Sequence, residues 1–520
     1  MSIVRTPIFY QAPTGNFKQV LGHGIARYGF FGFLNSDRAT SDMGPYVQSN
    51  LPPQMQALSV EYLAKKKSKT KRGLKKQLFS RLLQLFPSAL GTIESGTKLV
   101  MSPVVSTSDV ISGHFPGKDE LAQDSSWGTS TVKTDSLQGD LLWSTTVNLG
   151  SSSQPLRVNV DTGSADFFVF DPKCSTCALS THSAFLYAQS STFTPLVNIS
   201  FNAQYADGGG VNGYLAQDSL SFGAGVTIPH QLFGLATDVS GYWQSLGVDG
   251  LMGMGPDALS SFPPPNNQGV FTQLLKNKVI SQPVIGIALT KASTNSSGEF
   301  SFGKVNDQFI RGGSSQLLWK NVSSQNFWGT DLSGVFVDGT NVMASDDPPR
   351  AIVDTGTSLM LVSDKAAAGI HLKIPGAVMD SSNGIWRLPC SVATPAAAKR
   401  PTFASIFSGF MRPQRRATLR GAFTKAYATP PNIFVELGAG SQKFGIPVTD
   451  LAYQAIPSNE ANSLAGDGRT KMCYSGIQAG ADGFFVLGGT FIKNHYIALK
   501  RDGNNKSIGF GNRKDMPEIQ

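Results

Sequence analysis

The stretch that decides the fold occurs twice. Residues 158–170 read Val-Asn-Val-Asp-Thr-Gly-Ser-Ala-Asp-Phe-Phe-Val-Phe, and residues 351–362 read Ala-Ile-Val-Asp-Thr-Gly-Thr-Ser-Leu-Met-Leu-Val. In each copy an apolar strand leads into Asp-Thr-Gly followed by Ser or Thr, and a second apolar strand follows. Asp161 and Asp354 are 193 residues apart, about one domain length. The pattern predicts two β-rich units that each present one Asp at the tip of a turn.

A single Asp-Thr-Gly is most often an ordinary hairpin turn. Two copies between apolar strands, one domain length apart, are hard to obtain by chance. A carboxylate in a buried turn is unfavourable unless it is paired or functional. Two carboxylates about 3 Å apart cannot both ionise, so such a pair shares one proton. One of them then acts as a general base on water, while its protonated partner polarises a scissile carbonyl.

Further landmarks appear in a characteristic order along the chain. They are a hairpin with a tyrosine, two segments in which apolar residues lead into glycine, and a late strand: Gln204–Gly209, Asp249–Gly255, Phe485–Ile492 and Ile508–Phe510. With the repeated turn, they resemble the pepsin-like aspartic endopeptidases, with a spacing closest to the fungal members. The resemblance covers about residues 138–515. Each landmark alone would be a weak signal, but together and in register they are strong.

The resemblance implies an all-β, bilobal acid protease fold, with two β-barrel-like lobes and the active-site cleft between them. It implies that Asp161 and Asp354 are the catalytic pair. The supporting positions of the two turns are Thr162, Gly163, Ser164, Thr355, Gly356 and Thr357, and the substrate-binding flap is Tyr205, Ala206 and Asp207. Neither a metal nor an organic cofactor is implied. The implied partners are peptide or protein substrates and pepstatin-type inhibitors, and we expect a monomer.

The chain departs from the family's pattern at two positions near the flap. Phe168 stands where the family usually has a tryptophan whose ring N–H bonds the flap tyrosine, and phenylalanine has no donor. Ala206 replaces the usual flap glycine, so its N–H remains but its backbone is less free. Neither change removes a catalytic group. We therefore expect a looser flap and lower efficiency rather than a different activity.

Charge is unevenly distributed along the chain, whose formal net charge is +9. Residues 1–125 hold 15 Lys and Arg against eight Asp and Glu, and residues 391–430 hold seven Lys and Arg and no acid. Each segment thus carries +7, and the remainder carries −5. A nucleic-acid-binding protein would fit the net charge alone. Because no aromatic platform or known nucleic-acid-binding fold accompanies these residues, we expect no nucleic-acid partner.

The predicted organisation is a basic leader with linker (1–130), an N-terminal protease lobe (131–325) and a C-terminal lobe (326–520). The basic run Lys65–Lys76 precedes an amphipathic helix that ends at Pro87. This region fits a solvated basic helix, a nuclear-localisation or nucleic-acid patch, or a removable prosegment. The resemblance favours the prosegment, which would cover an acidic cleft, and Lys71-Arg72 is a candidate processing site.

The insertion 391–430 does not match the family. A long segment without periodicity inside a compact domain is unusual. An exposed basic loop, a processed segment and an unspliced insert all fit it, and we favour a disordered surface excursion.

The four cysteines fit two disulfides better than a redox or zinc site. Cys174 and Cys177 form a C-x-x-C motif, but the βαβ context of a redox pair is absent, and a zinc site would need a second C-x-x-C or a His pair in a chain with only six His. The resemblance implies the bridges Cys174–Cys177 and Cys390–Cys473, and two bridges imply an oxidising compartment. The N-terminus shows no recognisable signal peptide, and no run of 18 apolar residues predicts a membrane span. We expect a secreted or vacuolar protein.

The sequence therefore predicts an aspartic endopeptidase, made as a zymogen, that hydrolyses peptide bonds at acidic pH. The main alternative is a catalytically inactive pepsin-like protein that binds peptides. Both Asp-Thr-Gly turns are intact, which argues against that alternative.

Overall fold

The computed structural model describes residues 128–393 and 431–518, apart from short gaps at 180, 206–209, 224, 245, 295, 325, 381–383, 439–441, 459–462 and 481–482. The basic run, the helix before Pro87 and the Lys71-Arg72 site lie outside the described residues. So do residues 394–430 of the insertion and the flap residues Ala206 and Asp207.

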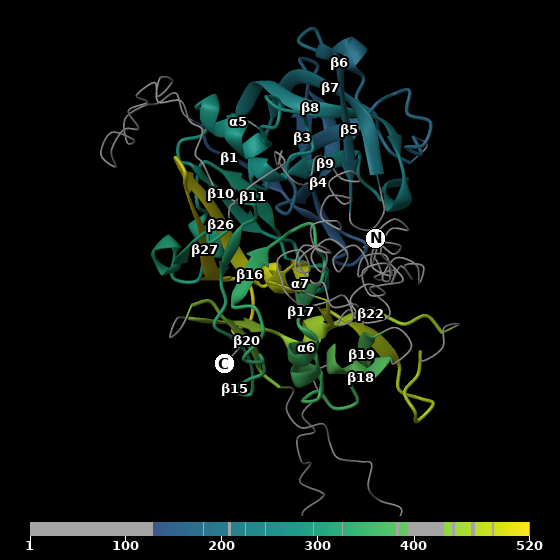
Figure 1. Cartoon of the computed structure of the whole chain (residues 1–520), viewed down its shortest axis with the longest axis vertical. Helices are drawn as coiled ribbons and strands as arrows, with labels where there is room; N and C mark the ends of the chain where they lie inside the picture. The colour runs from purple at the N-terminus through teal and green to yellow at the C-terminus, as the bar shows by residue number, and fades with distance from the viewer. Residues whose placement is uncertain are drawn as a thin grey trace, which may run out of the picture.

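The N-terminal lobe is built on one eight-stranded sheet (Figure 1). In sheet order its strands are β2 (Asp135–Leu137), β3 (Leu142–Leu149), β4 (Gln154–Asp161), β9 (Gly250–Gly253), β5 (Phe167–Phe170), β8 (Thr227–Val239), β7 (Gly210–Ser221) and β6 (Thr194–Gln204).

The C-terminal lobe contains three smaller sheets. A five-stranded sheet has the order β13 (Gly329–Asp331), β16 (Arg350–Val353), β25 (Phe485–Leu487), β17 (Met360–Val362) and β24 (Ile477–Ala479). One four-stranded sheet comprises β15 (Thr340–Asn341), β14 (Gly334–Val337), β20 (Ile433–Glu436) and β21 (Lys443–Ile446). The other comprises β18 (Val378–Asp380), β19 (Ile385–Pro389), β23 (Met472–Ser475) and β22 (Ala452–Ala455).

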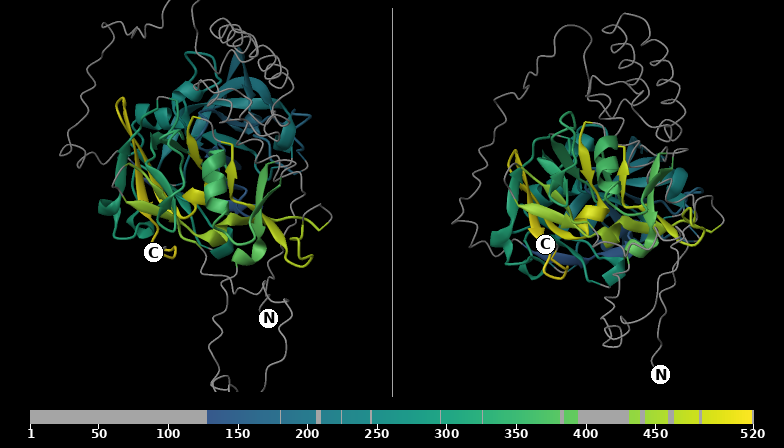
Figure 2. Two further views of the ribbon diagram at one scale, coloured as in Figure 1. Left: turned by 60° about the horizontal axis from the view of Figure 1, so that its bottom comes forward. Right: turned by 90° about the horizontal axis from the view of Figure 1, so that it is seen from below.

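A six-stranded sheet joins the two lobes. Its order is β1 (Ser130–Lys133), β11 (Glu299–Phe302), β10 (Val284–Ala288), β26 (His495–Asp502), β27 (Asn505–Asn512) and β12 (Leu318–Asn321). The sheet takes strands from both sides of the predicted boundary at residue 325. Seen from below in Figure 2, the green and yellow C-terminal lobe lies in front of the blue strands of the N-terminal lobe.

Helices are short and few in the described part of the chain. They are α5 (Val270–Lys276), α6 (Asp364–His371) and α7 (Gly489–Ile492). Ser363 caps α6, since its hydroxyl accepts a hydrogen bond from the N–H of Ala366 at 3.1 Å. None of the described helices is both long and apolar enough to cross a membrane. The predominance of strands and the two lobes confirm the predicted all-β, bilobal fold.

Both lobes repeat one arrangement of four strands. In the N-terminal lobe β4 runs parallel to β9, β9 antiparallel to β5, and β5 parallel to β8. In the C-terminal lobe β16, β25, β17 and β24 repeat these pairings in the same order and sense. The glycines that end the two apolar segments allow this close packing. A Cβ on Gly253 would lie 2.5 Å from the carbonyl carbon of Ala165, and one on Gly488 would lie 2.1 Å from the carbonyl oxygen of Leu359.

Alternation along β5 divides the apolar residues between two cores. Phe167 and Val169 belong to the main core, which extends through both lobes. Phe168 and Phe170 point to the other face and belong to a second core in the N-terminal lobe. This second core also contains both cysteines of the Cys174–Cys177 pair, and Tyr205 packs against it.

Candidate active site

The two predicted catalytic residues lie where two equivalent strands end. Asp161 is the last residue of β4, and Asp354 directly follows β16. β9 runs parallel to β4, and β25 runs parallel to β16. Each turn therefore lies at the C-terminal end of a parallel strand pair. Only 2% of Asp161 and none of Asp354 is exposed. Two carboxyl groups in so little contact with water need hydrogen-bond partners.

Hydrogen bonds between the two threonines join the turns across the lobes. The Thr162 hydroxyl donates to the carbonyl of Val353 at 3.0 Å and accepts from the N–H of Thr355 at 3.0 Å. The Thr355 hydroxyl donates to the carbonyl of Val160 at 2.7 Å and accepts from the N–H of Thr162 at 3.1 Å. Each hydroxyl thus makes the same two bonds to the opposite lobe. Both residues are buried, so water does not compete for these bonds.

The carboxylates have matching donors inside their own turns. The N–H of Gly163 donates to Oδ1 of Asp161 at 2.8 Å, and the hydroxyl of Ser164 donates to Oδ2 at 2.5 Å. At Asp354, the N–H of Gly356 donates to Oδ1 at 3.0 Å, and the hydroxyl of Thr357 donates to Oδ2. These bonds fix the plane of each carboxyl group.

One glycine shows how closely the turns approach. A Cβ added at Gly356 would lie 2.3 Å from Oδ1 of Asp161 and 2.6 Å from its Cγ. No side chain fits there, so the carboxylate of the first turn lies against the backbone of the second. The structure therefore brings the six supporting residues and both aspartates into one cluster.

The glycine-ended segments hold the turns from behind. The N–H of Met254 donates to the carbonyl of Asp161 at 2.8 Å, and the N–H of Gly255 donates to that of Ser164 at 2.6 Å. In the other lobe the N–H of Asp354 donates to the carbonyl of Leu487 at 3.2 Å. The N–H of Gly489 donates to the carbonyl of Thr357 at 2.7 Å.

Two tryptophans that the sequence analysis did not single out cross between the lobes. Trp143 of β3 packs on the turn behind Asp354, since a Cβ on Gly489 would lie 2.1 Å from its ring. Trp328, directly before β13, donates its ring N–H to the carbonyl of Met254 at 2.9 Å, behind Asp161. Each lobe therefore places one indole against the other lobe's support segment. No local pattern in the sequence marks either residue.

Buried ion pairs lie near the same support segments. Lys493, which follows α7, is 3.1 Å from Asp140, and Lys291 is 2.9 Å from Asp450. Burial alone would raise the pKa of Asp140, but the charge of Lys493 and the hydroxyl of Ser136 outweigh it, so the pKa lies below its usual value. This carboxylate therefore stays charged at lower pH than an ordinary aspartate and keeps its partner in acidic solution.

Of the predicted flap, only Tyr205 lies within the described residues. It follows β6 and is half-buried, with its ring centroid 5.1 Å from that of Trp243. Phe168, at the position of the family's usual tryptophan, contacts the same indole with centroids 5.2 Å apart.

Both predicted disulfides are formed, Cys174–Cys177 and Cys390–Cys473. The second bridge joins Cys390, directly after β19, to Cys473 of β23, 83 residues later. Among the described residues no group of three or more His, Cys, Asp or Glu is placed to hold a metal ion.

Comparison with known proteins gives the family to which the chain belongs. The family model described as "Eukaryotic aspartyl protease" matches residues 143–513. Similar proteins include Syncephapepsin of Syncephalastrum racemosum, 25% identical over 72% of this chain and 78% of its own length. Rhizopuspepsin-1 of Rhizopus niveus is 26% identical over 68% and 75%. Penicillopepsin-1 of Talaromyces stipitatus is 27% identical over 70% and 77%. The chain belongs to the eukaryotic aspartyl protease family and is a pepsin-like aspartic endopeptidase.

Proposed function

We propose that the protein hydrolyses peptide bonds at acidic pH with a water molecule activated between Asp161 and Asp354. One carboxylate accepts a proton from the water, and the protonated partner donates a hydrogen bond to the scissile carbonyl. Attack gives a tetrahedral intermediate, and no covalent acyl-enzyme forms. The proton shared by the pair is lost as pH rises, which accounts for an acidic optimum.

The observation that carries the proposal is the mirrored bonding of the two turns. Each carboxylate has a backbone donor and a hydroxyl donor on corresponding atoms. The contact of Gly356 with Asp161 supports the close approach that a shared proton requires. In this proposal the two threonines hold the turns together, and the glycines, Ser164 and Thr357 orient the carboxylates. Tyr205, Ala206 and Asp207 form the flap over the substrate.

We further propose that the chain is made as a zymogen and works in a secreted or vacuolar, oxidising space. The leader carries +7, opposite in sign to the −5 of the chain outside the two basic segments, and the disulfides support an oxidising compartment. Sequencing the N-terminus after acidification tests the first part. An active enzyme that still begins at Met1 would contradict it.

Cleavage of denatured globin at about pH 3–4, with and without pepstatin, tests the mechanism. We expect pepstatin-sensitive cleavage, and we expect Asp161→Asn and Asp354→Asn each to lower kcat by roughly 10²–10⁴-fold or more. Asp331→Asn, an exposed carboxylate on β13, is the matched control and should keep full activity. Robust cleavage by either active-site variant would refute the mechanism. Peptide binding without cleavage by the parent protein would favour the inactive, peptide-binding alternative.

A further inference from the structure

A chain of aromatic rings connects the flap to the strand that leaves the Asp161 turn. The Tyr205 ring lies against the Trp243 indole at 5.1 Å between centroids, with a tilt of 57°. Trp243 in turn meets Phe168 of β5 edge to face, at 5.2 Å. Phe168 and Phe170 follow at 6.4 Å. The indole thus lies between the flap tyrosine and Phe168 of β5.

We propose that Trp243 is a positioning residue for the flap: its indole supports the Tyr205 ring, and the Cys174–Cys177 loop fixes Trp243 in place. The inference rests on the proposed function of Tyr205 as a flap residue. The family's usual tryptophan would stand at Phe168, on the strand after the Asp161 turn. Trp243 instead reaches the flap from a separate segment, Gly241–Gln244.

Burial makes the indole a rigid support. Neither Trp243 nor Phe168 has any exposed surface, and both belong to the second core of the N-terminal lobe. Tyr205 is only half-buried and packs against the edge of that core. An indole enclosed on its other sides cannot turn away without opening a cavity, so Tyr205 rests on a fixed surface.

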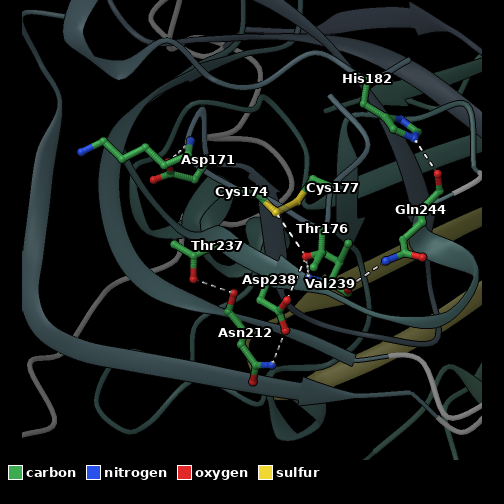
Figure 3. The surroundings of a disulfide bond; sticks show 11 residues. Asp171, Cys174, Thr176, Cys177, His182, Asn212, Thr237, Asp238, Val239 and Gln244 are labelled. Atoms are coloured by element: carbon green, nitrogen blue, oxygen red, sulfur yellow. Dashed lines mark hydrogen bonds between the residues drawn. A yellow bond between two sulfur atoms is a disulfide. The ribbon is translucent and has the colours of Figure 1, made fainter. Parts of the chain in front are cut away.

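The disulfide loop holds the short 3₁₀ turn that carries Trp243, Gly241–Gln244. Figure 3 shows Thr176, between the two cysteines, beside the end of β8. Its hydroxyl accepts from the N–H of Val239 at 2.8 Å and donates to Oδ1 of Asp238 at 2.9 Å. On the far side of the turn, Nε2 of His182 lies 3.4 Å from the carbonyl of Gln244. Residues on both sides of Trp243 are therefore bonded to the segment around the disulfide.

The second strand of the flap hairpin, β7, is hydrogen-bonded to the residue before the turn that carries Trp243. Gly210 begins β7, and its N–H donates to the Ser240 hydroxyl at 2.9 Å, while the N–H of Ser240 donates to the Gly210 carbonyl at 2.9 Å. Ser240 directly precedes the turn that carries Trp243. The segment that carries Trp243 is thus bonded to the start of β7 and contacts Tyr205 at the end of β6.

A flap tyrosine that is already placed reduces the ordering that substrate binding must impose. Loss of the support should therefore raise KM more than it lowers kcat. Because aromatic contacts of this kind contribute modestly, we expect Trp243→Leu to raise KM about fivefold and to change kcat less than twofold. Trp243→Phe keeps an aromatic face for Tyr205 and should raise KM about twofold at most.

The matched control is Trp386→Leu, which removes a buried indole stacked on His371 at 4.5 Å in the C-terminal lobe. It should lose thermal stability to a similar degree and leave KM unchanged. A double-mutant cycle with Tyr205→Ala tests the pathway, because residues that act through one another are not additive. Trp243→Leu should raise KM no further once Tyr205 is alanine. Equal KM in the Trp243 and Trp386 variants, or full additivity with Tyr205→Ala, would overturn the proposal.

Hydrogen exchange supplies a readout that does not depend on catalysis. Backbone amides around residues 200–212 should exchange faster in Trp243→Leu than in the parent, and at the parental rate in Trp386→Leu. Unchanged exchange in Trp243→Leu would refute the role of the indole. If the parent protein cleaved no peptide, the proposed function would fail, and the exchange rates would still decide whether Trp243 supports the flap.

Discussion

The turn that carries Asp161 and the turn that carries Asp354 share their backbone bonds but differ in what surrounds them. Five residues after the aspartate, the first turn has Asp166 and the second has Leu359. The Asp166 carboxylate accepts hydrogen bonds from Ser260 at 2.5 Å and from the N–H of Ser261 at 2.9 Å. Leu359 instead packs in the main apolar core. At this one position the first turn therefore makes polar bonds, whereas the second makes apolar contacts.

Against this difference, the two turns share the bonds that orient their carboxylates. The bonds that orient both carboxylates come from the same backbone and hydroxyl positions in each lobe. The fifth residue after each aspartate differs in chemistry, while the strand arrangement of the two lobes is the same.

Among the residues that support the two aspartates, the largest effect should come from Gly356, where the two turns touch. In Gly356→Ala the new methyl group would lie 2.3 Å from Oδ1 of Asp161, so the carboxylate must move. Displacements of this kind at a reacting group lower rates by about 10²-fold. We expect kcat to fall by about that factor, measured on a peptide substrate. Gly466→Ala, where a Cβ would meet nothing within 4 Å, is the control, and equal kcat in the two variants would show that the turns need no close contact.

The crossed threonines should be energetically equivalent. Thr162→Val and Thr355→Val each remove one hydroxyl with two bonds and leave buried backbone groups of the other lobe without partners. We expect each to lower the free energy of unfolding by about 2–4 kcal/mol, with the double variant below the sum, measured by urea denaturation. Thr227→Val, on the exposed start of β8, should change little. A difference above about 2 kcal/mol between the two variants would mean that the symmetric bonding hides unequal contributions.

The smallest effect should be a change in how stability depends on pH. Burial raises the pKa of Asp166 above its usual value of 3.8, although the bonds from Ser260 and Ser261 oppose the shift. The folded state therefore holds this proton more tightly than the unfolded state. The resulting stability is fully present below pH 3.8 and is lost as pH rises through the folded pKa.

Asp166→Asn removes this titration, so its melting temperature should decline less than that of the parent as the solution is brought from acidic to neutral pH. Melting curves across that range measure the difference. The exposed carboxylate of Asp331 gives the control variant Asp331→Asn, whose curve should follow the parent. Parallel curves for Asp166→Asn and the parent would show that the buried acid does not contribute to the pH dependence.

Local patterns made much of the site predictable. The aspartates and their glycines lie in a short apolar stretch that occurs twice, so the sequence alone shows them, whereas the segments behind the turns were recognised from the family resemblance. The roles of the threonines and the cysteine pairings came from the family resemblance. Trp143, Trp328 and Trp243 were not predictable as contacts, because each meets a segment far away in the chain and no periodic signal marks it. The six-stranded sheet, which pairs strands on both sides of the predicted boundary at residue 325, was not predicted either, because its partners are also far apart in the chain.

That six-stranded sheet has a consequence for how the chain folds as it is made. Ile287 of β10 lies opposite Ile497 of β26, 210 residues later. At roughly 5–20 residues per second, a ribosome supplies this partner roughly 10–40 s after β10. Until then β10 and β12 present open edges, which are the sites where strands from other chains add. Strands β26 and β27 thus complete this sheet, and a chain that stops before residue 495 would emerge with the edge of β10 uncovered.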